Sequence, residues 1–162
     1  MPQPDALATI YAGWEAYQGR LVRAVASLTP EQFALRAAPN LRSIGEIAVH
    51  IARGRAQWLH YALNEGTEAT AVVLAWRAVD GHDPTAIEIV RGLESTWAAL
   101  QAAMARWTPE ELARAFTIML NGEERTVTRQ WVIWHFLEHD LHHGGELALY
   151  MGMYGLRGSE LI

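Results

Sequence analysis

Four long segments of this 162-residue chain repeat apolar residues at steps of three and four positions, the period of an amphipathic helix. They run from about residue 5 to 27, 43 to 64, 85 to 106 and 128 to 152. Hydrophobic residues make up 51% of the chain, so each helix has ample apolar surface to bury against the others. We therefore expect an all-α protein, a four-helix bundle that forms a single domain over residues 1–162.

Local signals mark where two of these helices begin. Ser43-Ile-Gly-Glu46 has the spacing of a capping box, in which the serine hydroxyl and the glutamate each satisfy a backbone N–H of the first turn. Thr128 can cap the last helix in the same way. The stretch over residues 67–83 lacks a clear period, and we expect a looser connection there.

A small β-hairpin is expected immediately before the last helix. Asn121-Gly122 lies between β-prone residues in the stretch 116–127, and this dipeptide is the strongest short signal for a two-residue hairpin turn. An isolated pair of strands is marginally stable, so the hairpin must pack on the helices.

Composition excludes several classes of protein. The formal net charge is -5 and the chain lacks lysine, which argues against a basic surface for nucleic acid. Cysteine is absent, so any metal must be bound by His, Asp, Glu or water. The sequence has neither an apolar run long enough to span a bilayer nor the pattern of a secretory signal, and a cytoplasmic location is expected.

Four of the seven histidines fall within nine residues of the last helical segment. His135, His139 and His143 are each four residues apart, so they form a column along one helix face, and His142 falls on the same side. Imidazoles at this spacing can offer two nitrogens to one metal ion. The rest of the segment is apolar on nearly every side, which predicts a buried helix whose histidines face a cavity or cleft.

The column has three interpretations. It could be a solvated polar face, it could line a wet cavity in a purely structural bundle, or it could bind a metal. Four histidines at this spacing favour the metal site, because buried imidazoles need partners. A third ligand from another helix would strengthen this interpretation, and His50, which borders the apolar face of the second helix, is the best candidate.

Two motifs give the chain a resemblance to a known family. Ile47-Ala-Val-His50-Ile in the second helix and His139-Asp-Leu-His-His143-Gly-Gly-Glu146-Leu in the fourth, with a glycine close to Tyr154-Gly155, resemble the DinB-like (DinB/YfiT) metalloenzymes. The resemblance covers essentially the whole chain. It implies a four-helix bundle in which three histidines bind a divalent metal.

Carried over by position, the ligands are His50, His139 and His143. His135 then supports the site or lines its pocket, unless it replaces His143 as a ligand. His142 and Glu138 could orient a ligand or substrate, and Trp131 could line a pocket. The family's arginine and glutamine become Gly144 and Glu146 here, and Glu146 could accept a hydrogen bond from a ligand imidazole or act as a catalytic base.

A three-histidine site implies a function without fixing it. Zinc, nickel and iron all suit imidazole ligands. Some relatives are S-transferases of low-molecular-weight thiols, so the resemblance implies a metal-dependent thiol S-transferase or hydrolase. The alternative is a non-catalytic stress-response bundle that binds a metal or small ligand. Excess apolar helix surface also predicts a homodimer, and we expect neither nucleic acid nor a membrane as a partner.

Overall fold

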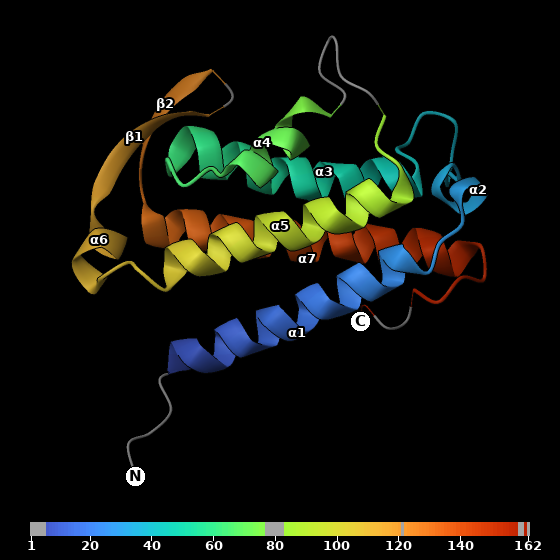
Figure 1. The fold of residues 1–162 in the computed structure, drawn as a ribbon, viewed down its shortest axis with the longest axis horizontal. Coiled ribbons are helices and arrows are strands. Elements are labelled where there is room, and N and C mark those ends of the chain that lie inside the picture. The colour runs from blue at the N-terminus through green and yellow to red at the C-terminus, as the bar shows by residue number, and fades with distance from the viewer. Residues whose placement is uncertain (1–5, 77–82, 121, 159–160, 162) are drawn as a thin grey trace.

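Four long helices form the body of the protein (Figure 1). The computed structural model describes residues 6–76, 83–120, 122–158 and 161. The four helices are α1 (Ala6–Ala26), α3 (Ile44–Gln57), α5 (Ala86–Met104) and α7 (Arg129–Met153). α3 packs against both α5 and α7, and α1 packs against α5. The expected all-α bundle is therefore confirmed; the expected start of the first helix at Asp5 lies outside the described residues.

The predicted caps are present. The Ser43 side chain accepts from the Glu46 backbone N–H, and the Glu46 side chain accepts from the Ser43 N–H, so the capping box at the start of α3 is complete. Thr128 caps α7 by accepting from the Trp131 backbone N–H. Both interactions satisfy backbone donors that the first helical turn leaves without a partner.

The connection after α3 differs from the expectation in two ways. The predicted second helix is not uniform, because after Gln57 it continues as a π-helix, η1 (Trp58–Ala62). The stretch expected to be loose contains a further helix, α4 (Glu68–Ala75), whose first turn is capped by Thr67. The helical period does not reveal α4, because apolar residues lie on almost every side of this helix. The remaining short helices are α2 (Pro30–Phe33) and α6 (Pro109–Ala113).

The predicted hairpin is confirmed. Strands β1 (Ala115–Leu120) and β2 (Glu123–Thr128) pair antiparallel, and Leu120 lies opposite Glu123. This register leaves a two-residue loop, in which Gly122 has a φ of 83° that favours glycine. Asn121, the other loop residue, lies outside the described part. β2 leads directly into α7, so the hairpin is fixed at the start of the helix that bears the histidine column.

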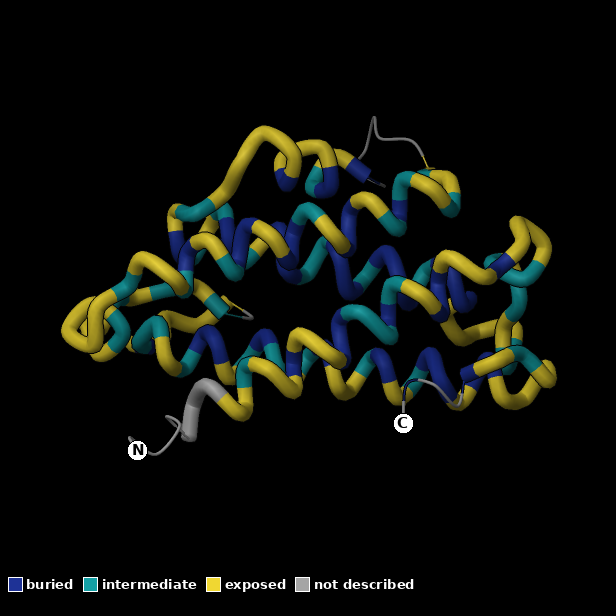
Figure 2. The backbone as a smooth tube through the Cα atoms, turned by 60° about the horizontal axis from the view of Figure 1, so that its bottom comes forward, coloured by how far each residue is buried: buried dark blue, intermediate teal, exposed yellow. Residues whose placement is uncertain are grey.

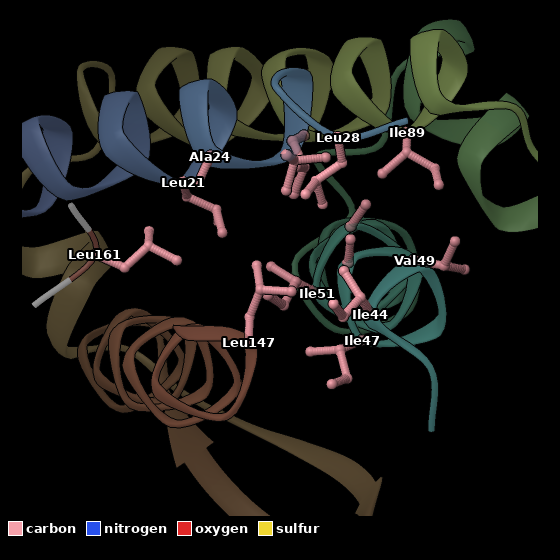
Figure 3. Packing of buried hydrophobic residues seen from close by; sticks show 14 of the residues in the cluster. Leu21, Ala24, Leu28, Ile44, Ile47, Val49, Ile51, Ile89, Leu147 and Leu161 are labelled. Carbon is pink, nitrogen blue, oxygen red and sulfur yellow. The ribbon is translucent and has the colours of Figure 1, made fainter. Parts of the chain in front are cut away.

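The core lies where the helices face each other, and the buried stripes in Figure 2 turn inward along them. Figure 3 shows Leu21 of α1 and Leu147 of α7 pointing into the space beside Ile51 of α3, and all three side chains are fully buried. Because Ile51 is fixed in this core, the preceding residue, His50, is held at the edge of the core beside α7. None of the helices in the described residues is long and apolar enough to cross a membrane.

α7 is not buried on all sides, which corrects the expectation drawn from its composition. Trp134, Leu141 and Leu149 are 59%, 48% and 63% exposed. Its other face is buried through residues such as Phe136 and Leu147. The apolar residues of this helix therefore serve two surfaces, the bundle core and an exposed stripe.

Candidate metal centre

Three histidines from two helices meet between α3 and α7. The Nε2 atom of His50 lies 3.1 Å from Nε2 of His143 and 3.3 Å from Nε2 of His139. One ring nitrogen from each of the three residues falls within 4.8 Å of the others. All three side chains are partly buried, so the group lies at the boundary between the core and solvent. The structure therefore brings together the three histidines that the two motifs singled out.

The spacing of the three imidazoles fits a metal ion. Two nitrogens bound to a tetrahedral ion at about 2.0–2.1 Å lie about 3.3 Å apart. The two Nε2–Nε2 distances measured from His50, 3.1 and 3.3 Å, are close to that separation. A set of three histidines also leaves room for a further ligand, as in catalytic zinc sites. The donor set and its geometry are therefore compatible with one divalent ion.

Glu146 fixes the orientation of one of these rings. Its Oε2 lies 2.9 Å from Nδ1 of His143, one turn away on the same helix. A carboxylate can only accept, so Nδ1 carries the hydrogen and donates it. The lone pair of His143 is then on Nε2, the atom that faces His50. This arrangement is the one in which a histidine ligand donates its second nitrogen to a carboxylate.

The other two imidazoles are held neutral. Burial, with the positive charge of Arg42 as the second cause, lowers the pKa of His50 to about 4. Burial and, second to it, the neighbouring His143 together lower the pKa of His139 to about 3. Metal ligation requires neutral imidazole. Both residues therefore meet this requirement at neutral pH without losing a proton.

His135 and His142 lie beside the cluster rather than in it. The His135 ring stacks on Trp131 at a centroid distance of 5.3 Å and meets the edge of Trp58 at 4.7 Å. Its Nδ1 lies 3.4 Å from Glu138 Oε2. His142 is exposed, and its ring packs edge-on against His143 at 4.7 Å. In this geometry His135 does not take the place of His143. Of its two aromatic neighbours, Trp131 is the one that the sequence suggested as a pocket residue.

Two glycines allow the close packing around the site. A Cβ atom on Gly54 would lie 2.8 Å from Cε1 of His139, so this position of α3 must be small for the ring to lie against the helix. A Cβ on Gly144 would lie 1.6 Å from the Tyr17 hydroxyl. The resembled family has an arginine at position 144, and the Tyr17 side chain from α1 fills that space here. The departure from the family pattern therefore has a packing reason.

A buried polar network lies directly behind the cluster, and the sequence interpretation did not identify it. Asp140, the residue after His139, is fully buried and pairs with fully buried Arg55 of α3 through two hydrogen bonds of 2.9 and 2.7 Å. The Asp140 carboxylate also accepts from Trp14 Nε1 at 2.8 Å. Arg55 donates in addition to Gln18 Oε1 at 2.7 Å. The network therefore joins α1, α3 and α7 at the level of the histidines.

A weak signal of this network is present in the sequence. Arg55 follows Ile47 and Ile51 at four-residue steps, so it falls on the core face of its helix. A charged residue at a core position needs a buried partner. The sequence offers Asp140, Glu46, Glu138 and Glu146 as carboxylates that could accept from a ligand imidazole. The structure pairs Asp140 with Arg55, whereas Glu46 caps α3 and pairs with Arg36.

Comparisons with known proteins agree with this architecture. The model of the DinB family matches residues 1–158. A solved DinB-like protein from Bacillus cereus is 19% identical, with a TM-score of 0.72 over 90% of this chain and 91% of that chain. A DinB-like protein from Bacillus subtilis is 18% identical, with a TM-score of 0.61 over 86% of this chain and 88% of that one. At these identities the two structures show a shared fold. A search among curated proteins found no match.

Proposed function

Because this chain belongs to the DinB family, we propose that it is a metalloprotein in which His50, His139 and His143 bind one divalent ion of zinc, nickel or iron. The convergence of the three imidazoles, with Nε2 distances of 3.1 and 3.3 Å, carries the proposal. Glu146 supports it by fixing the tautomer of His143. The low pKa values of His50 and His139 support it as well, since both rings are ready to bind without deprotonation.

The reaction that best suits this site is transfer of a low-molecular-weight thiol to an electrophile, with hydrolysis as the variant in which water replaces the thiol. A divalent ion held by neutral histidines lowers the pKa of a bound thiol or water. In the transfer, the thiol sulfur bonds to the electrophilic carbon, and the leaving group departs with the electron pair of the broken bond. The thiol proton passes to solvent or to Glu146, whose side chain is 26% exposed.

The protein's own residues would position the reactants. His143 is oriented by Glu146, and His139 rests against Gly54, so two of the rings are held before any ligand arrives. The Arg55–Asp140 pair joins the two helices that supply the three histidines. Fixed ligands of this kind keep the bound reactants in a constant orientation.

Metal content of untagged protein tests the binding step. We expect one ion per chain in the wild type and loss of that ion in His139→Ala/His143→Ala. The matched control is His135→Ala/His142→Ala, which removes two histidines from the same helix but leaves the cluster intact, and it should keep its metal. Stoichiometric metal in the first double variant would show that the assignment is wrong.

A panel of thiols tests the catalytic step. Metal-loaded protein should transfer a thiol to a chromogenic electrophile, and removal of the metal by a chelator should abolish the transfer. Loss of the free thiol and appearance of the leaving group would be measured together, because the reaction releases one leaving group for each thiol consumed. Metal binding without turnover of any pair would favour the alternative, a non-catalytic binding protein.

A further inference from the structure

A groove lies between the end of the second long helix and the hairpin. It has a volume of about 420 Å³, which is within the range of small-molecule sites. One wall comes from the end of α3 and from η1, and the other from β1. The lining residues are Gln57, Trp58, Tyr61 and Ala62 on the first wall and Thr117, Ile118, Met119 and Leu120 on the second.

The chemistry of the groove favours an uncharged apolar ligand. All eight lining side chains are uncharged, and its side-chain polar groups are those of Gln57, Thr117, Trp58 and Tyr61. Two large apolar side chains at the groove are unusually exposed, Tyr61 at 80% and Met119 at 65%. Tyrosine and methionine adapt readily to apolar partners, since one offers a flat ring and the other a flexible chain.

The backbone of the helical wall is itself unusual. η1 is a π-helical turn, and the Leu63 N–H bonds to the Trp58 carbonyl five residues earlier at 3.0 Å. Such turns are rare within helices and occur frequently at functional sites. Here the π-turn begins at Trp58, a lining residue of the groove.

Trp58 connects the groove to the three-histidine cluster. Its ring lies 4.7 Å from the His135 ring and 5.8 Å from the Trp131 ring. The His135 ring in turn lies 6.2 Å from that of His139. His135 therefore lies between this wall of the groove and a proposed metal ligand. A larger hollow of about 500 Å³ lies at the other end of α3, and two of its charged lining residues, Arg36 and Glu46, bind each other.

We propose that the groove between η1 and β1 binds an uncharged aromatic or short alkyl group of the substrate, and that Trp58, against which His135 packs, forms the side of the groove nearest the metal centre. This inference rests on the proposed function, since it names the class of substrate for the same site. It assigns a role to the hairpin, which supplies half of the groove. It also gives a role to His135 and Trp131, which pack around Trp58.

A neutral fluorescent probe, N-phenyl-1-naphthylamine, tests the groove directly. The variant Tyr61→Gln/Met119→Thr replaces two exposed side chains, so the fold should be little affected. We expect its affinity for the probe to fall about tenfold, because apolar contact surface is lost. The matched control is Val72→Thr/Ile87→Gln, which replaces two exposed apolar residues outside the groove and should bind the probe like the wild type. Equal affinity in all three proteins would overturn the proposal.

Proximity to the histidines is tested separately. With Co²⁺ bound, proton signals of the bound probe should be broadened relative to the Zn²⁺-loaded protein, and the effect should disappear in the groove variant. The link to the metal centre would be overturned if the groove variant loses probe binding but the probe signals in the Co²⁺-loaded wild type are not broadened. Metal content is measured in every sample, and probe binding is repeated on metal-free protein. Failure to bind metal would therefore contradict the proposed function, whereas unchanged probe affinity would contradict the groove.

Discussion

Removing the negative charge of Asp140 should destabilise the protein severely. The carboxylate accepts three hydrogen bonds, two from Arg55 and one from Trp14, at 2.7–2.9 Å. Asp140→Asn keeps the size of the side chain but leaves the Arg55 guanidinium fully buried without a counter-charge. Breaking a buried pair in this way costs about 3–5 kcal/mol. For a domain of this length we expect Tm to fall by roughly 6–20 °C.

Urea unfolding followed by circular dichroism measures this loss. The control is Glu123→Gln, which breaks the exposed pair with Arg125 at 3.6 Å and should change the free energy of unfolding by less than about 1 kcal/mol. Arg55→Met/Asp140→Leu removes both charges and should be less destabilised than Asp140→Asn alone, because no buried charge is left unpaired. A loss below about 1 kcal/mol for Asp140→Asn would refute this reasoning.

Three further outcomes are expected. Gly54→Ala should weaken metal binding about tenfold in calorimetric titration, because the new Cβ would lie 2.8 Å from the His139 ring. The stability of the protein should not fall, since alanine favours the helix more than glycine does. Unchanged metal affinity would show that the His139 ring does not depend on this space. In metal-free protein the free energy of unfolding should decrease as pH falls from about 6.5 towards about 4. Over that range unfolded histidines take up protons, whereas His50 and His139, with pKa values of about 4 and about 3, do not. Replacing both by glutamine should flatten this slope in urea unfolding, and an unchanged slope would assign it to other groups. We also expect a homodimer whose interface covers the exposed side chains of Leu141 and Leu149. Sedimentation should detect this dimer in the wild type, and Leu141→Glu/Leu149→Glu should dissociate it. A monomeric wild type would contradict the prediction.

Features encoded by neighbouring residues were predictable from the sequence. The caps at Ser43 and Thr128 and the turn at Gly122 each depend on residues a few positions apart, and all three are present. Histidine spacing in α7 is local in the same sense, because one helix turn brings His139 and His143 onto one face. The convergence of His50 with them depends on how α3 packs on α7. Its place beside the apolar face made His50 a candidate, and the family resemblance implied its role as a ligand.

Features encoded by distant residues were not predictable. Arg55 and Asp140 are 85 positions apart, so their pairing follows from the packing of the helices and not from a motif. The π-turn at Trp58 also leaves no period in the sequence, because it changes the hydrogen bonding of a continuous helix. Tyr61 and Met119 line one groove only after the hairpin has folded back beside η1. The groove therefore emerged from the structure alone.

Anomalous scattering from crystals of untagged protein, grown with one equivalent of Zn²⁺ and measured at the zinc edge, tests the central claim most directly. We predict a single strong peak between α3 and α7, at about 2.0–2.1 Å from Nε2 of His50, His139 and His143. A strong peak at His142, at Glu138 or elsewhere on the surface, without one at the three-histidine cluster, would contradict the account.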